Sequence, residues 1–158
     1  MQYALMALFA AGVVAVDQFT KYWVVANIPL YSQADAIPGL FHLTYVQNTG
    51  AAFSSFEGMQ WLFVLIFALF TAALVWEFAK KRWGFTDLER WFLIAVYAGG
   101  LGNMIDRVRL GYVVDMIHLD FMDFPVFNVA DCFITCGCIA LIAHLIFFNK
   151  AFWKDERK

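Results

Sequence analysis

The chain has 158 residues, of which 63% are hydrophobic and only 15% carry a charged side chain. Soluble domains average about 45–50% apolar residues, so a water-soluble fold of this composition would lack the polar surface that it needs. The net charge of −2 says little about partners, and no basic patch supports nucleic-acid binding. The composition predicts a single membrane-embedded domain over residues 1–158.

Four apolar stretches are long enough to cross a bilayer, which takes about 20 helical residues. They cover residues 3–26, 59–79, 88–105 and 127–148. The first is expected to be a retained span rather than a cleaved signal, because it has no basic start and continues past Val16 to Asp17. The expected fold is an all-α integral membrane protein with four transmembrane helices.

The basic residues predict how these helices are oriented. They concentrate in the link after the second stretch and in the tail after the fourth, so the positive-inside rule places both termini and this link in the cytoplasm. The outer segments are then residues 27–58 and 106–126. The basic residues of the link and tail are Lys80, Lys81, Arg82, Arg90, Lys150, Lys154, Arg157 and Lys158.

The two outer segments differ in pattern. Within residues 40–46, Phe41, Leu43 and Tyr45 alternate with His42, Thr44 and Val46, and an Asn-Thr-Gly turn follows. Alternation with period two followed by a turn predicts a short strand or hairpin. The second outer segment is rich in acidic and aromatic residues, and we expect it to be a loop.

Polar side chains gather at the outer ends of the predicted spans, whereas the inner halves carry only Glu77 and His144. Ionisable groups within a membrane are costly, so a cluster at one depth indicates a functional site. The cluster comprises Asp17, Lys21, Asn48, Asn103, Asp106, Arg107, Asp115, Asn128 and Asp131.

Two sets of helical neighbours belong to this cluster. Gly99, Asn103 and Arg107 recur four residues apart and share one helix face, where small residues allow a second helix to approach closely. Arg107 either extends to the headgroups or holds nearby carboxylates or asparagines. Asp17 and Lys21 are spaced as an ion pair that would anchor a helix end.

Asp115 and Asp131 lack such local partners. Asp131 has no basic residue three or four positions away, and Asp115 lies within the apolar stretch YVVDMI. Two carboxyl groups that meet at a dry interface share one proton. One could take a proton from an attacking water while its partner donates to a peptide carbonyl. The alternative is that Asp131 caps a helix and Asp115 is exposed in a loop.

Five ordered blocks resemble the lipoprotein signal peptidase family, also called signal peptidase II. The resemblance extends from the first span into the fourth. The blocks are VDQFTK at 16–21, NTGAAFS at 48–54, GNMIDR at 102–107, VVDMI at 113–117 and FNVADCFI at 127–134.

The resemblance implies a four-helix aspartic protease of the bacterial inner membrane. Such enzymes cleave diacylglyceryl-modified prolipoproteins before the lipid-bearing cysteine, and globomycin inhibits them. Asp115 and Asp131 would be the catalytic pair. The resemblance also implies a small outer β-structure and a loop at 116–126 that closes over the site, with membrane lipids as surroundings and no cofactor. We expect a monomer. The family's polar residues around the substrate match Asp17, Asn48, Asn103, Arg107 and Asn128, with Lys21 and Gly99 as further support.

Three other functions compete with this one. A serine–lysine peptidase could use Ser54 or Ser55 with Lys21 as base. A proton-coupled transporter would use buried acids, but it needs polar groups at several depths. A structural or chaperone-like membrane subunit has no reason to hold two unpaired carboxylates at one depth.

No metal site is predicted. Cys132 and Cys136 share a helix face, but small buried cysteines are far more common than thiolate metal pairs. His42, His118 and His144 each stand alone in the sequence, without a second ligand at a useful spacing.

Overall fold

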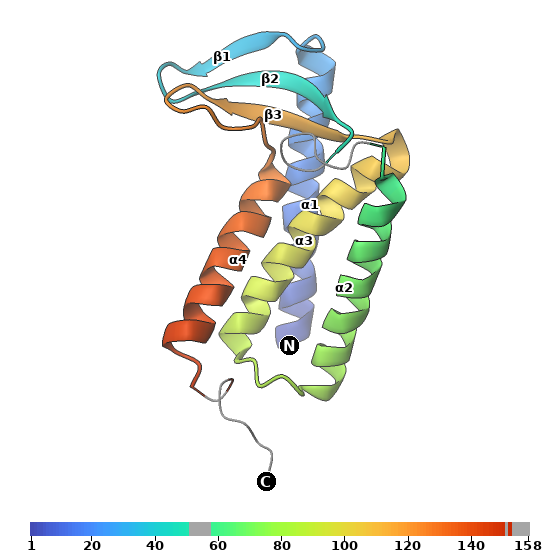
Figure 1. Cartoon of the computed structure of the whole chain (residues 1–158), viewed down its shortest axis with the longest axis vertical. Coiled ribbons are helices and arrows are strands. Elements are labelled where there is room, and N and C mark those ends of the chain that lie inside the picture. Colours follow the sequence, from blue (N-terminus) through green and yellow to red (C-terminus); the bar gives the residue numbers. More distant parts are fainter. Residues whose placement is uncertain (51–57, 151, 153–158) are drawn as a thin grey trace.

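The structure, a computed structural model, describes residues 1–50, 58–150 and 152. In these residues a helical bundle carries a three-stranded antiparallel sheet at one end (Figure 1). The start of α1, the link between α2 and α3 and the end of α4 lie at the other end (Figure 1). The elements are α1 (Gln2–Asn27), β1 (Gln33–Ile37), β2 (Phe41–Asn48), α2 (Gln60–Lys80), α3 (Asp87–Leu110), β3 (Val113–Leu119) and α4 (Val129–Phe147).

Three of the helices, α1, α2 and α4, are long and apolar enough to cross a membrane. Large apolar side chains such as Trp61, Leu69 and Ile139 point outward from them and are mostly exposed. A water-soluble protein rarely exposes continuous apolar faces of this size, so lipid is their natural environment. The fourth helix, α3, has 24 residues and a more polar composition, and it packs against each of the other three.

Side-chain caps set the starts of α3 and α4. Thr86 and Glu89 form a capping box before α3, in which each side chain accepts a hydrogen bond from the other residue's backbone N–H. Asn128 and Asp131 form the same arrangement at the start of α4. Since the first N–H groups of a helix have no intrahelical partner, these boxes stabilise the helix starts. Asp131 is thus held in a defined orientation.

The sheet has the strand order β1, β2, β3. The predicted strand at 40–46 corresponds to β2, but the prediction that residues 106–126 form a loop is wrong, because α3 continues to Leu110 and β3 covers Val113–Leu119. Pairing with β2 forms this strand although Asp115 and His118 interrupt its apolar pattern. Partners distant in sequence decided the conformation here.

A small apolar core joins the sheet to α1. Val24 and Ile28 at the end of α1 pack with Tyr45 of β2 and with Val114 and Met116 of β3. Each of these side chains is at most 6% exposed. The core fixes the sheet over the helix ends and thereby fixes the position of Asp115, which lies between Val114 and Met116.

The inner end of the bundle holds a buried polar network that the sequence analysis did not anticipate. The Arg90 guanidinium donates to Glu77 Oε1 at 3.0 Å. Glu89 accepts from Asn149 at 2.7 Å and lies 2.8 Å from His144 Nδ1. The prediction that His144 stands alone is therefore wrong, and Glu77 also has a buried partner. Their partners flank the apolar stretches and come together only through helix packing.

Glycines permit the closest helix contacts. A Cβ atom added at Gly99 would lie 2.4 Å from the Ala130 carbonyl oxygen and 2.9 Å from the Ile134 side chain. A Cβ atom at Gly102 would lie 2.5 Å from Asp17 Oδ2. Because real Cβ atoms do not approach so closely, any larger residue must separate α3 from its neighbours.

Replacing Gly99 with Ala is expected to destabilise the protein by about 1–3 kcal/mol, the usual cost of overpacking. The matched control is Gly12→Ala in α1, where an added Cβ meets nothing within 4 Å and the change should be neutral or slightly stabilising. Thermal unfolding in detergent measures both variants. Equal unfolding temperatures for the two would contradict the close packing of α3 on α4.

Candidate active site

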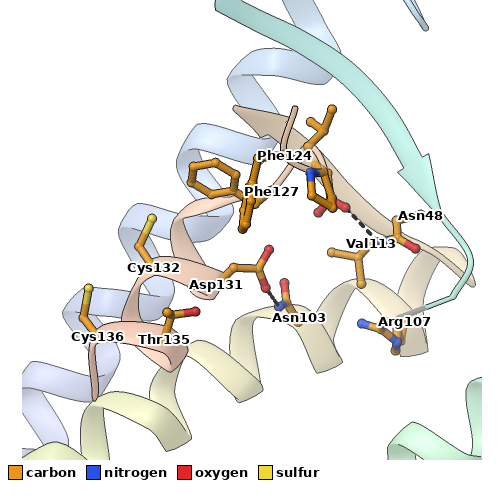
Figure 2. A pocket seen from close by; sticks show the side chains of 13 residues that line it. Asn48, Asn103, Arg107, Val113, Phe124, Phe127, Asp131, Cys132, Thr135 and Cys136 are labelled. Atoms are coloured by element: carbon orange, nitrogen blue, oxygen red, sulfur yellow. Dashed lines mark hydrogen bonds between the residues drawn. The ribbon is translucent and has the colours of Figure 1, made fainter. Parts of the chain in front are cut away.

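Asp115 and Asp131 line one cavity of about 560 Å³ beneath the sheet (Figure 2). Asp115 lies in β3 and is only 3% exposed, while Asp131 lies in the first turn of α4. Asn48, Asn103 and Arg107 complete the polar part of the wall. The remaining lining residues are Val113, Phe124, Pro125, Val126, Phe127, Cys132, Thr135 and Cys136.

Asn128 connects the two carboxyl groups. Its side-chain Nδ2 donates to Asp115 Oδ1 at 2.7 Å, and its backbone N–H donates to Asp131 Oδ2 at 3.1 Å. The expectation that Asp131 could cap a helix is therefore met, but the same carboxyl group also faces the cavity. The alternative that Asp115 is exposed in a loop is wrong.

Two further asparagines hold the outer oxygens of the pair. Asn48 Nδ2 donates to Asp115 Oδ2 at 2.9 Å, and Asn103 Nδ2 donates to Asp131 Oδ1 at 2.7 Å. Figure 2 shows Asn103 and Asp131 facing each other across the gap between α3 and α4. Each carboxyl group thus accepts hydrogen bonds on both oxygens, so its orientation is fixed while one edge stays open to the cavity.

Lys21 supports this arrangement by contacting Asn103, which in turn holds Asp131. Its buried ammonium group lies 2.9 Å from Asp17 Oδ2, 2.9 Å from Asp106 Oδ2 and 2.9 Å from Asn103 Oδ1. An ammonium group has three N–H donors, and here each has an acceptor. The predicted pair of Asp17 and Lys21 exists, but it lies inside the protein and orients Asn103.

The two acids around Lys21 reach the elements that carry the cavity's carboxyl groups. Asp17 Oδ1 accepts from the Ala130 backbone N–H at 2.9 Å, at the start of α4. Asp106 Oδ2 accepts from the Val114 backbone N–H at 3.1 Å, beside Asp115 in β3. Gln18 joins both acids through its side-chain amide. The ion pair therefore fixes α4 and β3 relative to α1.

Sequence reasoning placed Asp106 in the outer polar cluster without a specific role, and it did not single out Gln18. Asp106 lies directly before Arg107 in the GNMIDR block, and Gln18 follows Asp17 in the VDQFTK block, so both blocks contained the signal. The side-chain amide of Gln18 also donates to the Gly102 carbonyl at 3.1 Å.

Arg107 and Gly99 occupy different environments despite their shared helix face. Arg107 lines the cavity, donates to the Gly50 carbonyl at 2.6 Å and lies over the Phe63 ring at 4.4 Å. These two contacts hold the Arg107 side chain. Among the described residues, no carboxylate forms a direct ion pair with it. Gly99 packs against Ala130 in α4.

The serine–lysine alternative finds no support in the described residues. Ser54 and Ser55 lie outside them. Lys21 donates to three acceptors and is 3% exposed, so it has no free lone pair and no access to an incoming hydroxyl group.

Burial raises the pKa of Asp115 to about 6. The hydrogen bonds from Asn48 and Asn128 oppose this rise, while the negative charge of Asp131 adds to it. Because removing a carboxylate from water disfavours its charged form, Asp115 retains its proton at pH values where an exposed aspartate has lost it.

This raised pKa predicts a specific dependence of stability on pH. Between the ordinary value of 3.8 and about 6, the folded protein binds a proton at Asp115 that the unfolded chain has released. The contribution of Asp115 to the stability of the folded protein is therefore fully present below pH 3.8. It is lost as the pH rises to about 6. In Asp115→Asn that loss should vanish. Thermal unfolding in detergent at pH 4, 5, 6 and 7 measures it, and an identical decline in both proteins would contradict the assignment.

A model of the family described as signal peptidase (SPase) II matches residues 9–147. The lipoprotein signal peptidase of Streptococcus thermophilus (strain CNRZ 1066) is 46% identical over 149 residues, which cover 92% of this chain and 90% of that protein. The lipoprotein signal peptidase of Streptococcus pyogenes serotype M2 is 43% identical over 159 residues, covering 99% and 97%. A solved bacterial membrane enzyme superposes with a TM-score of 0.86 at 33% identity, covering 98% of this chain and 94% of that one.

Proposed function

Because this chain belongs to the signal peptidase II family of bacterial membrane proteases, we propose that it removes signal peptides from diacylglyceryl-modified prolipoproteins, cleaving before the lipid-bearing cysteine. The observation that carries this proposal is the pair Asp115 and Asp131, which Asn128 bridges at the wall of one cavity. Two carboxyl groups on one cavity suit the hydrolysis of a peptide bond without a cofactor.

The two aspartates take different roles in the proposed reaction. Asp115, whose pKa burial raises to about 6, is the group that enters the reaction protonated, whereas Asp131 takes a proton from a water molecule in the cavity as that water attacks the peptide carbonyl carbon. Asp115 donates its proton to the carbonyl oxygen, which gives a neutral tetrahedral intermediate. As the C–N bond breaks, the proton on Asp131 passes to the nitrogen, and Asp115 regains a proton from a hydroxyl group of the intermediate.

The other lining residues bind the substrate in this proposal. Asn48 and Asn103 fix the carboxyl groups, and the Arg107 guanidinium at the cavity wall would donate hydrogen bonds to peptide carbonyl oxygens. The apolar wall formed by Phe124, Pro125 and Phe127 suits the lipid chains of the modified cysteine. A globomycin-type inhibitor would occupy the same cavity.

We further propose that α3 is a fourth transmembrane helix. Its 24 residues give a length of roughly 36 Å, enough for a bilayer core, and its polar residues Glu89, Arg90, Asn103 and Asp106 are buried. The basic link of Lys80, Lys81 and Arg82 lies at the end opposite the sheet (Figure 1), which supports a cytoplasmic location for that end. The active site would then face the outer leaflet of the bacterial inner membrane, in a single-domain monomer over residues 1–158.

Cleavage of matched substrates tests the proposed activity. The purified protein in lipid–detergent micelles should cleave a prolipoprotein that carries a diacylglyceryl-modified cysteine, and mass spectrometry should find that cysteine at the new N-terminus. The same prolipoprotein with an unmodified cysteine should be cleaved far more slowly. Equal cleavage of both substrates, or cleavage at another bond, would contradict the proposal.

A further inference from the structure

A second cluster of polar side chains lies on the sheet, outside the cavity. His42 of β2 is the direct register partner of His118 of β3, and their ring centroids are 4.5 Å apart. Asp120, just after β3, lies with its Oδ1 atom 2.6 Å from His42 Nδ1. The prediction that His42 and His118 stand alone is therefore wrong. The two histidines are 76 positions apart in the sequence, and the pairing of β2 with β3 brings them together.

Two buried ring nitrogens in this cluster, His42 Nε2 and His118 Nδ1, have no hydrogen-bond partner among the described residues. A buried polar atom without a partner costs free energy, so such atoms in a folded protein indicate a ligand, an ion or a water. One ligand atom from each of His42, His118 and Asp120 lies within 4.8 Å of the other two.

The surroundings of the cluster favour a cation. Residues 28–58 and 111–126 contain no lysine or arginine, while they include Asp35, Asp120 and Asp123 among their acids. In the antiparallel register of β1 and β2, Asp35 pairs with His42 and offers a further carboxylate on the same side of the sheet. An excess of acidic over basic side chains in these segments attracts positive ions.

We propose that His42, His118 and Asp120 form a binding site for a divalent transition-metal ion of the zinc class. Two imidazoles and one carboxylate are a ligand set that Zn²⁺ accepts, with a fourth position left for water or for Asp35. Ligand atoms around a tetrahedral zinc lie about 3.4 Å apart, so adjustments of the three side chains within the present cluster would bring one atom of each to the ion. Both histidines and Asp120 are partly exposed, which leaves a path for the ion.

The site is separate from the aspartate pair and has a structural consequence for it. Neighbouring residues of a strand point to opposite faces, so His118 and Asp115 lie on different faces of β3. A metal bound here joins β2 to the start of the segment after β3, whose Phe124 and Phe127 line the cavity. Occupancy would therefore stabilise the outer wall of the cavity without contacting the reacting groups.

Metal binding to tag-free protein tests this proposal. Titration with ZnCl₂ should show one saturable site per chain, and zinc should raise the unfolding temperature of the wild type. Cobalt(II) should give visible absorption bands typical of a four-coordinate nitrogen–oxygen site. His118→Gln and Asp120→Asn should each weaken binding by at least about tenfold. The control Asp123→Asn, an exposed acid outside the cluster, should bind as the wild type does.

Three results would overturn the proposal. The first is an absence of saturable binding by the wild type. The cluster would then be only a hydrogen-bonded histidine–carboxylate pair. The second is unchanged affinity in Asp120→Asn, whose folding is checked by its unfolding temperature in EDTA. The third is a thiolate absorption band with cobalt(II), or loss of binding after alkylation of cysteines, which would assign the metal to Cys132 and Cys136.

Discussion

Replacing either Asp115 or Asp131 with Asn is expected to lower the single-turnover rate of prolipoprotein cleavage by at least about a thousandfold. The amide keeps the size of the side chain, but it cannot take a proton from water or donate one to the peptide carbonyl. Because the two carboxyl groups act as a unit, each single replacement should cost nearly as much as both together. The rate is measured with a lipidated prolipoprotein and excess enzyme.

Two controls make this expected loss specific. Asp35→Asn removes an exposed acid of β1 outside the cavity and should retain the wild-type rate. A variant with both Ser54→Ala and Ser55→Ala should also remain active, since no serine nucleophile is needed. Turnover above about a tenth of the wild-type rate in either aspartate variant would contradict the mechanism.

Replacing Lys21 with Met is expected to destabilise the folded protein by about 3–5 kcal/mol, the cost of removing one partner from a buried ion pair. The change leaves Asp17 and Asp106 buried and facing each other without their shared cation. It also removes a hydrogen bond from Asn103, so we expect lower activity as well. Thermal or denaturant unfolding in detergent measures the loss of stability.

A double replacement identifies the cause of that loss. Combining Lys21→Met with Asp106→Asn removes one of the two uncompensated charges, so the double variant should be less destabilised than the sum of the single variants. Lys21→Arg keeps the positive charge, so it is the control for the effect of a changed side-chain shape at this position. Strictly additive effects would show that the ion pair contributes nothing through its charges.

Local sequence signals predicted the helices well and the sheet poorly. The apolar stretches correspond to α1, α2 and α4, and the alternative that Asp131 caps a helix agrees with its place in the first turn of α4. Strand β3 was missed because its conformation depends on pairing with β2, which lies more than 60 positions away. The inner network around Glu77 was missed for the same reason, since Arg90 approaches it only after α2 and α3 pack.

The candidate site was predictable as a set of residues but not as a set of contacts. The common depth of the polar residues and the five ordered blocks both indicated Asp115 and Asp131. Neither signal could reveal that Asn128 bridges them, or that Lys21 contacts Asn103 across 82 positions. Those contacts depend on close helix approach at Gly99 and Gly102.

The most direct measurement of the central claim is an experimental structure of the protein with a globomycin-type inhibitor. We predict that a polar group of the inhibitor lies within hydrogen-bond distance of both Asp115 and Asp131, inside the cavity that Asn48, Asn103 and Arg107 line. An inhibitor bound away from this cavity, with the two carboxyl groups too far apart for one water molecule to bridge, would contradict it.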